Sequence, residues 1–257
     1  MDFRLTPIID GNNTGDDTLV FVQGWPDDAS VWDRQVAALG ERYRCVRLTM
    51  PNFSGTRETR RGHSTEEILD ALARCVREVS PEDAVTLILH DWGSYWGHLL
   101  HQRHPQLAWR IVTLDVAPQF QPRLWTIPLI LAYQGWLAGA FLVGCSVGDW
   151  MTRRVASAMR APAPPGRLTA WMNYPYRNMF ADLLSGRASS GGDDYWPEIP
   201  LLFAYGKRKP FPFHSAAWVE HLARTGGRVV ALDWNHWVML DPEFDEILST
   251  WLEATDR

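Results

Sequence analysis

The stretch that most constrains the fold is residues 85–105, where a short apolar run passes through one acidic residue into a helical pattern. Residues 85–89 read Val-Thr-Leu-Ile-Leu, which is typical of a buried strand. Asp91 and Gly93 follow closely, and residues 95–105 have a helical pattern that ends at a proline. A strand that turns so sharply into a helix presents one polar side chain at the turn, and here that side chain is Asp91.

Strand and helix patterns alternate on both sides of this turn, which predicts an α/β fold. Such alternation favours a mostly parallel central sheet, with right-handed crossovers that place helices on both faces. Residues 1–16 read as an opening hairpin, and Ser64 with Glu67 has the spacing of a capping box. The expected strands are residues 18–22, 44–50, 110–115, 200–205 and 228–232, and the expected helices are 32–39, 64–79, 216–224 and 242–254.

The alternation breaks between residues 119 and 196, which are helical in pattern and rich in Trp, Tyr, Pro and Gly. We predict a core domain of residues 1–118 and 197–257 and a helical lid of residues 119–196. Residues 124–148 contain no charged residue over a length that suits a membrane span. Because a proline and four glycines interrupt this segment, we favour a lid over an apolar pocket. A lid that rests on a membrane surface is the minor alternative.

Composition excludes several classes of function. The net charge is −5 and no basic tract is present, so nucleic acid is not an expected partner. Cys45, Cys75 and Cys145 have neither metal-binding nor redox spacing, and the N-terminus lacks the apolar core of a signal peptide. We therefore expect a cytoplasmic protein without metal or cofactor, and the sequence leaves room for a homodimer.

A carboxylate at such a turn is a potential nucleophile, because it is ionised at neutral pH and needs no base to activate it. Attack on carbon leaves an ester on Asp91, and hydrolysis of that ester requires a histidine base oriented by an acid. His236 follows the last expected strand, which agrees with the order of nucleophile first and histidine last along such chains. The alternatives are a helix N-cap for Asp91 and a surface loop for His236. Ser94 is a weaker nucleophile candidate, since tryptophans stand two positions to either side.

Negative charge on oxygen in these steps calls for backbone N–H donors. The N–H groups of Trp92, directly after Asp91, and of Trp25, in the loop Gln23-Gly24-Trp25-Pro26, are the two candidates. A simple turn is the alternative interpretation of that loop.

With these motifs the chain resembles the soluble epoxide hydrolase branch of the α/β-hydrolase superfamily over nearly its whole length. His90-Asp91-Trp92-Gly93 resembles the nucleophile motif, Gln23-Gly24-Trp25-Pro26 the His-Gly-X-Pro oxyanion loop, and Asn235-His236-Trp237 the base motif. Residues 173–179 and Tyr133-Gln134 resemble two lid segments. The resemblance implies a small apolar epoxide as substrate, with Tyr176 and Tyr133 as donors to the epoxide oxygen. A phenol can supply that proton at neutral pH.

Three positions depart from the family pattern. Leu89 stands where glycine is usual, and Gln23 replaces the first histidine of the oxyanion loop. The resemblance implies that Gln23, with Trp25 and Trp92, belongs to the oxyanion and substrate-binding site. The third departure is the loop Gly206-Lys207-Arg208-Lys209, which is basic where the family places the orienting acid. Asp115, at the end of another strand, is our first choice for that acid, ahead of Asp233 and Asp241. The three basic residues are interpreted as a solvated loop, with binding of an anionic substrate group as the alternative.

Two other functions stay open at this point. Haloalkane dehalogenases share the Asp-Trp-Gly turn, and Trp92 suits a halide donor, but Trp25 occupies the usual place of the second donor, an asparagine. If no acid reaches His236, the protein is a weak hydrolase or a ligand-binding member of the fold. The paired tyrosines favour the epoxide.

Overall fold

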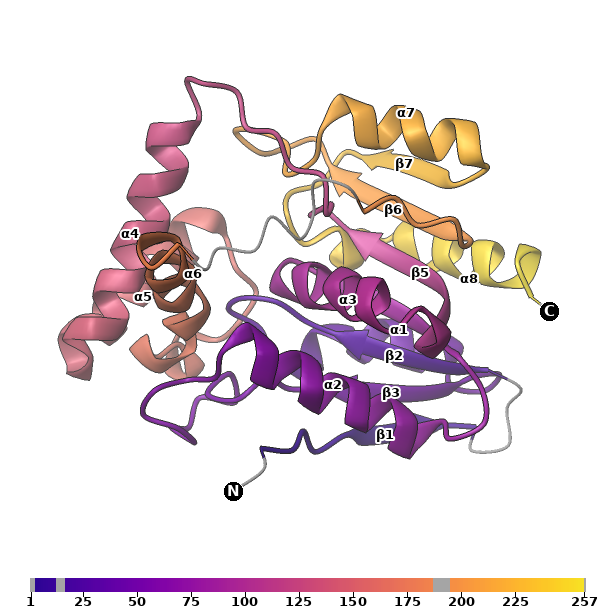
Figure 1. The fold of residues 1–257 in the computed structure, drawn as a ribbon, viewed down its shortest axis with the longest axis horizontal. Coiled ribbons are helices and arrows are strands. Elements are labelled where there is room, and N and C mark those ends of the chain that lie inside the picture. The colour runs from indigo at the N-terminus through magenta and orange to yellow at the C-terminus, as the bar shows by residue number, and fades with distance from the viewer. Residues whose placement is uncertain (1–2, 13–16, 187–194, 257) are drawn as a thin grey trace.

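A computed structural model describes residues 3–12, 17–186 and 195–256, and its centre is a seven-stranded sheet in the order β1-β3-β2-β4-β5-β6-β7 (Figure 1). Every neighbouring pair is parallel except β1 with β3. The strands are β1 (Ile8–Gly11), β2 (Thr18–Val22), β3 (Arg44–Leu48), β4 (Val85–His90), β5 (Ala108–Leu114), β6 (Leu201–Gly206) and β7 (Arg228–Leu232). The predicted α/β fold with a mostly parallel sheet is confirmed.

The predicted opening hairpin is wrong. β1 pairs with β3, with Ile8 opposite Arg47, rather than with β2, which follows it in the chain. Both edges of β2 are already hydrogen-bonded, to β3 and to β4, so the free edge of β3 is the place left for β1. The turn expected at Gly11-Asn12-Asn13 falls partly in residues 13–16, which lie outside the described residues.

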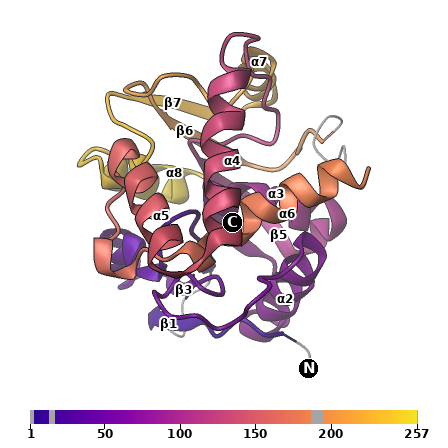
Figure 2. The ribbon, with the colours of Figure 1, turned by 90° about the vertical axis from the view of Figure 1, so that its left-hand side faces the viewer.

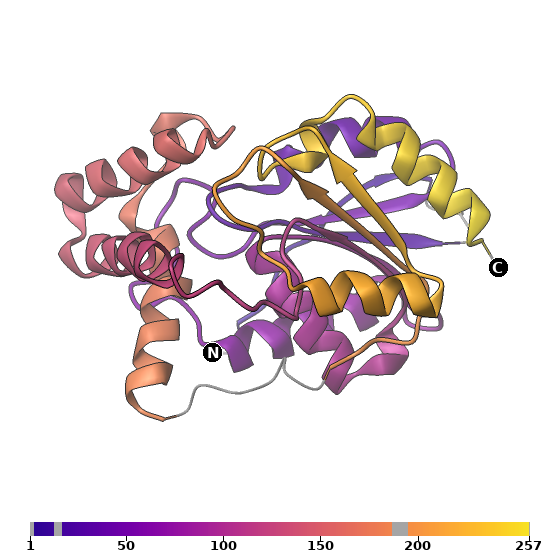
Figure 3. The same ribbon diagram turned by 90° about the horizontal axis from the view of Figure 1, so that it is seen from above.

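Helices cover both faces of the sheet (Figure 3). α2 (Thr65–Val79), α3 (Trp92–Arg103) and α7 (Ala216–Thr225) pack on one face, where Ile68, Trp96 and Trp218 enter the core. α1 (Asp33–Leu39) and α8 (Phe244–Ala254) pack on the other. The capping box of Ser64 and Glu67 is present at the start of α2. Short 3-10 turns are η1 (Ala29–Trp32), η2 (Pro105–Leu107), η3 (Pro165–Arg167), η4 (Ala170–Asn173) and η5 (Val238–Leu240).

Three helices follow β5 before the chain returns to the sheet: α4 (Ile127–Val143), α5 (Cys145–Met159) and α6 (Tyr174–Leu184). We call residues 119–186 the helical insert. It lies beyond the carboxyl ends of the parallel strands, at the left of Figure 1. Tyr174 and Tyr176 of α6 are buried in the same core cluster as α2 and α3. Among residues 3–12, 17–186 and 195–256, no helix is long and apolar enough to cross a membrane.

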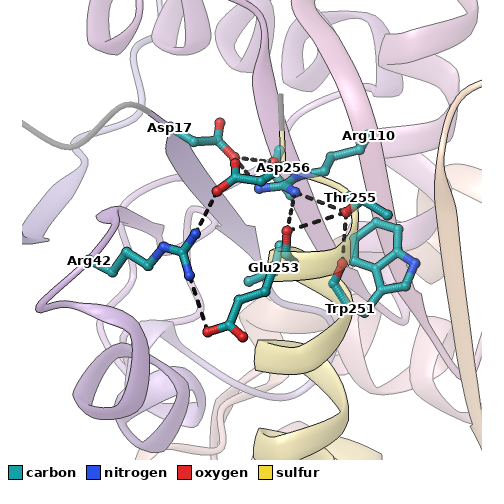
Figure 4. A network of polar contacts seen from close by, with 9 residues as sticks. Asp17, Arg42, Arg110, Trp251, Glu253, Thr255 and Asp256 are labelled. Atoms are coloured by element: carbon teal, nitrogen blue, oxygen red, sulfur yellow. Dashed lines mark hydrogen bonds and ion pairs between the residues drawn. The ribbon is translucent and has the colours of Figure 1, made fainter.

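A buried ion pair closes the opposite end of the sheet (Figure 4). Arg110, near the start of β5, is fully buried and pairs with Asp17. Its other donors reach Thr86 Oγ1 at 2.6 Å, the Leu252 carbonyl at 2.8 Å and Thr255 Oγ1 at 3.0 Å. Because every part of the guanidinium has a partner, this pair joins β4, β5 and α8 without leaving buried charge unsatisfied.

Candidate active site

Asp91 occupies the sharp turn between β4 and α3 with a φ of 51° and a ψ of −119°, a conformation rare for residues other than glycine. Neighbouring glycines make room for it. A Cβ on Gly93 would meet the Val22 carbonyl oxygen at 2.2 Å, and one on Gly24 would meet the Asp91 Cβ at 2.4 Å. The predicted strand–turn–helix is therefore present, and the acidic side chain stands at its tip.

Leu89 is accommodated by a glycine on the helix instead of one on the strand. A Cβ on Gly97, in α3, would lie 2.4 Å from two methyl carbons of Leu89. The leucine side chain thus fills the space that a glycine at position 89 would leave. α3 can still pack close to β4, because residue 97 has no side chain. Ser94, the rival nucleophile, is fully buried.

Backbone N–H groups of two tryptophans hold the Asp91 carboxylate. The Trp25 N–H donates to Asp91 Oδ2 at 2.8 Å, and the Trp92 N–H also hydrogen-bonds this carboxylate. The Trp25 indole turns away from the carboxylate and donates to Asn173 Oδ1 at 2.7 Å, and Asn173 donates to Thr152 Oγ1 at 2.6 Å. The loop is therefore fixed to the helical insert through Asn173, a residue that sequence reasoning did not single out for this task.

Gln23 does not reach the site. With its amide oriented to suit its neighbours, it donates to the Leu48 carbonyl and accepts from the Met50 N–H at 2.9 Å. The side chain is fully buried between the ends of β2 and β3. The prediction of a substrate-binding Gln23 is corrected, because these two backbone groups take both ends of its amide.

His236 lies between two carboxylates. Its Nδ1 is 2.5 Å from Asp115 Oδ2, and its Nε2 is 3.6 Å from Asp91 Oδ1. Asp115 directly follows β5 with a φ of 66° and accepts from the Gly206 N–H at 2.9 Å. The structure thus brings together Asp91, His236 and Asp115, with Asp115 as the acid next to the imidazole. Asp233 instead pairs with Arg208 at the surface, and Asp241 accepts from the Glu243 N–H.

The basic loop has two parts with different roles. Arg208 is exposed and pairs with Asp233, as expected for a solvated loop. Lys209 differs from that expectation: its side chain is 7% exposed and its Nζ pairs with Asp115 Oδ1. The cation therefore points inward to the carboxylate that holds His236. The sequence marked the loop as unusual but gave no direction for the Lys209 side chain.

The charges of these groups support one another. Burial opposes the charge of Asp115, but Lys209 and His236 outweigh burial and hold the pKa of its carboxyl at about 2. Burial likewise opposes charge on His236, yet Asp115 and Asp91 raise the pKa of its imidazole to about 9. For Asp91, interactions with His236 outweigh burial and keep the pKa of the carboxyl below its usual value. Burial lowers the pKa of Lys209, although its ion pair with Asp115 opposes that shift. At neutral pH the resting site holds two carboxylates and an imidazolium.

A third carboxyl, that of Asp27, is buried and interacts electrostatically with His236. It accepts from the Trp237 indole at 2.6 Å, and burial raises its pKa to about 7 despite that hydrogen bond. Asp27 follows Trp25-Pro26 directly, but nothing in the sequence distinguishes it from an ordinary turn residue.

A cavity of about 720 Å³ opens above Asp91. Tyr133 of α4 and Tyr176 of α6 both line it, with their ring centroids 6.4 Å apart. Burial and the charge of Asp91 raise the pKa of both phenols, so both are protonated at neutral pH. The rings of Trp92 and Tyr176 meet edge to face, with their centroids 5.2 Å apart. Much of the remaining wall is apolar or aromatic, including Trp96, Val116, Phe120, Met179 and Phe213.

The fold is that of the α/β hydrolases. The sequence model of the alpha/beta hydrolase fold family matches residues 17–148, just over half of the chain, and the protein belongs to this family.

Among curated proteins, the probable oxidoreductase EphD of Mycobacterium tuberculosis is 31% identical over 114 residues, 43% of this chain and 19% of EphD. A cis-3-alkyl-4-alkyloxetan-2-one decarboxylase of Xanthomonas campestris is 24% identical over 168 residues, 59% of this chain and 56% of the decarboxylase. The matched region thus spans less than two thirds of either relative.

Solved structures extend the similarity of fold to nearly the whole chain. An epoxide hydrolase of Bacillus megaterium aligns with a TM-score of 0.68 and 17% identity, over 97% of this chain and 96% of that one. A haloalkane dehalogenase variant from Bradyrhizobium elkanii aligns with a TM-score of 0.68 and 13% identity, over 97% of this chain and 93% of that one.

Proposed function

We propose that this protein is a hydrolase that opens the epoxide ring of an apolar substrate through an ester on Asp91. One observation carries the proposal: backbone N–H donors and the His236–Asp115 pair meet at Asp91, and two protonated tyrosines share its cavity. The groups needed to hydrolyse an ester on Asp91, and those needed to protonate an alkoxide, therefore lie in the same site. The helical insert would act as the lid that supplies the tyrosines.

In the first step, Asp91 attacks an epoxide carbon and forms a C–O ester bond. The ring C–O bond breaks, and its electron pair stays on the epoxide oxygen. Tyr176 or Tyr133 gives that oxygen a proton and becomes a tyrosinate. The donation is needed because an alkoxide is a poor leaving group.

In the second step, neutral His236 takes a proton from water, and the resulting hydroxide attacks the ester carbonyl. The N–H groups of Trp25 and Trp92 stabilise the oxyanion. As the intermediate collapses, His236 returns its proton to the departing alkoxide and the diol is released. The new Asp91 carboxyl gives its proton to the tyrosinate, so the sum is epoxide plus water to diol.

The charge on Asp91 determines when His236 can act as a base. In the resting site the Asp91 carboxylate helps raise the pKa of His236 to about 9, so the imidazole is protonated at neutral pH. Esterification removes this negative charge and lowers the pKa of His236, so the imidazolium gives its proton to solvent water. The neutral imidazole can then act as the base in the second step. It takes a proton back from solvent when the Asp91 carboxylate is restored.

The test is a single turnover of an aryl-substituted epoxide in water labelled with heavy oxygen, with enzyme in excess, followed by mass spectrometry of the Asp91 peptide. The expected result is one heavy oxygen in the Asp91 carboxylate. His236→Gln should instead accumulate the peptide with the added mass of the substrate. An unlabelled Asp91 and no adduct would overturn the covalent mechanism.

One observation disfavours dehalogenation. Among the described residues, those that line the cavity do not include Trp25, whose indole is bound to Asn173. A halide ion would therefore lack an indole donor from the Trp25 position. Halide release from a haloalkane, unaffected by Tyr176→Phe, would favour the dehalogenase instead. An oxetan-2-one belongs in the same substrate panel, because one relative is named for it.

A further inference from the structure

Exposed apolar side chains concentrate on the helical insert. Of the fourteen large hydrophobic residues that are exposed in the described part of the chain, eleven lie between residues 124 and 184. The most exposed are Leu124 and Leu184 at 87%, Leu142 at 74% and Trp125 at 63%. A gathering of this kind differs from the single exposed apolar residues of ordinary surfaces and marks an interaction surface.

The face is built mainly by α4, which is apolar on all sides. Ile130, Leu137 and Phe141 are buried, whereas Leu129, Trp136 and Val143 are exposed along the opposite side. Leu131 and Leu142 widen this exposed side. A helix that is apolar on all sides is usually buried on all sides. One side of α4 is instead exposed to solvent.

α5 extends the face beside α4, as Figure 2 shows. Val147 and Trp150 are exposed on it, and the Trp150 ring lies 6.3 Å from that of Trp136. The Arg154 guanidinium lies 5.4 Å from the centre of the Trp150 ring. We call the exposed apolar residues of α4 and α5, with Leu124 and Trp125, the insert face.

Positive charge accompanies this face. The insert carries six arginines and only two acidic residues, although the whole chain has a net charge of −5. Arg123, Arg154 and Arg160 are exposed, whereas Asp149 is tied to the Ala170 N–H at 2.7 Å. The insert is therefore the positive pole of an acidic molecule, which orients it toward anionic surfaces.

We propose that the insert face docks on an anionic phospholipid bilayer. Exposed tryptophans, leucines and nearby arginines are the features of surfaces that lie in the bilayer interface, where rings and arginines meet the headgroups. A second copy fits less well, because a two-fold interface would bring the arginines of one insert against those of the other.

Docking would also place the cavity next to the lipid, because Tyr133 and Gln134 on the inner side of α4 line it. Resting on the proposed function, this extends the substrate class to epoxides dissolved in the membrane. The docking itself is independent of that function and is tested without turnover.

The test is flotation of the full chain with vesicles of phosphatidylcholine alone or of phosphatidylcholine and phosphatidylglycerol in equal parts. Wild type should float with the anionic vesicles, less so at high salt, and its tryptophan emission should shift to the blue. Arg154→Glu should lower the partition coefficient by about tenfold or more, since each surface arginine contributes about a fivefold gain and the substitution reverses the charge. Leu142→Glu should abolish flotation.

Matched controls lie outside the insert. Arg4→Glu reverses an exposed charge, and Ile8→Glu adds a charge at an exposed apolar residue; both should float like wild type. Leu142→Glu should keep its turnover of a water-soluble epoxide, which separates loss of docking from loss of catalysis. Failure of wild type to float, equal flotation of Leu142→Glu, or a dimer in sedimentation that Leu142→Glu dissociates would overturn the proposal.

Discussion

The two ends of β5 each carry a buried ion pair, and the pairs differ in how completely they are enclosed. Arg110 with Asp17 closes the amino end, with fixed partners for every part of the guanidinium. Lys209 with Asp115 stands past the carboxyl end, where the carboxylate also holds His236 beside the cavity. A buried ion pair therefore stabilises the fold at the amino end of β5. At the carboxyl end, a buried ion pair determines the charge of His236.

The largest effect is expected from Asp115→Asn. The amide cannot stabilise the His236 imidazolium or hold its reactive tautomer, so ester hydrolysis should fall by about 10³ to 10⁴. Alkylation should persist, and the ester on Asp91 should accumulate in a single turnover. Quenched-flow mass spectrometry measures both steps. Unchanged turnover would remove Asp115 from the mechanism.

Asp17→Asn should have the opposite profile. It leaves Arg110 buried without its carboxylate, so the free energy of unfolding should fall by about 3–5 kcal/mol. Turnover per folded molecule should not change, because the pair lies at the far end of the sheet. Urea unfolding provides the measurement. Arg42→Met, which removes an exposed arginine of the same network (Figure 4), is the matched control and should cost about 1 kcal/mol or less.

Lys209→Met is expected to act through His236. Without the ammonium, Asp115 stabilises the imidazolium more strongly and the pKa of His236 rises. The acid limb of the pH profile for ester hydrolysis should move up by about one unit, with about a tenfold loss at neutral pH. Lys209→Arg should restore most of the profile. A purely structural lysine would instead lower stability and leave the profile in place.

A further expected effect concerns stability against pH. Folding raises the pKa of His236 from 6.5 to about 9, so its charge stabilises the folded state fully below about pH 6.5. This stabilisation should be lost as the pH rises through 9. Urea titrations across that window should show the loss in wild type and in Asp17→Asn, and a shallower slope in His236→Gln. Parallel slopes in all three would contradict the raised pKa.

Much of the sheet and part of the candidate site could be predicted from the sequence, because both depend on local patterns. Buried parallel strands are short apolar runs, and the sharp turn at Asp91 is marked by a glycine two residues on. Asp115 could be chosen because parallel strands bring their carboxyl ends to one edge of the sheet. His236 followed from chain order.

What could not be predicted depends on contacts between distant segments. The partner of β1 was decided by which sheet edge remained free, and the inward direction of Lys209 by a carboxylate 94 residues earlier in the chain. The roles of Gln23 and Asn173 likewise rest on groups far away in sequence. Local composition carries no signal for any of these.

The contact between Leu89 and Gly97 has a consequence for how such sites are recognised. Clearance at the turn is a joint property of a strand residue and a helix residue, so it can be supplied from either element. Gly97→Ala should be damaging alone and much less so when combined with Leu89→Gly, which a double-mutant cycle would reveal as coupling. A sequence motif that requires glycine on the strand therefore describes only one of two ways to make room at the turn. The other way places the glycine on the helix, several residues after the nucleophile.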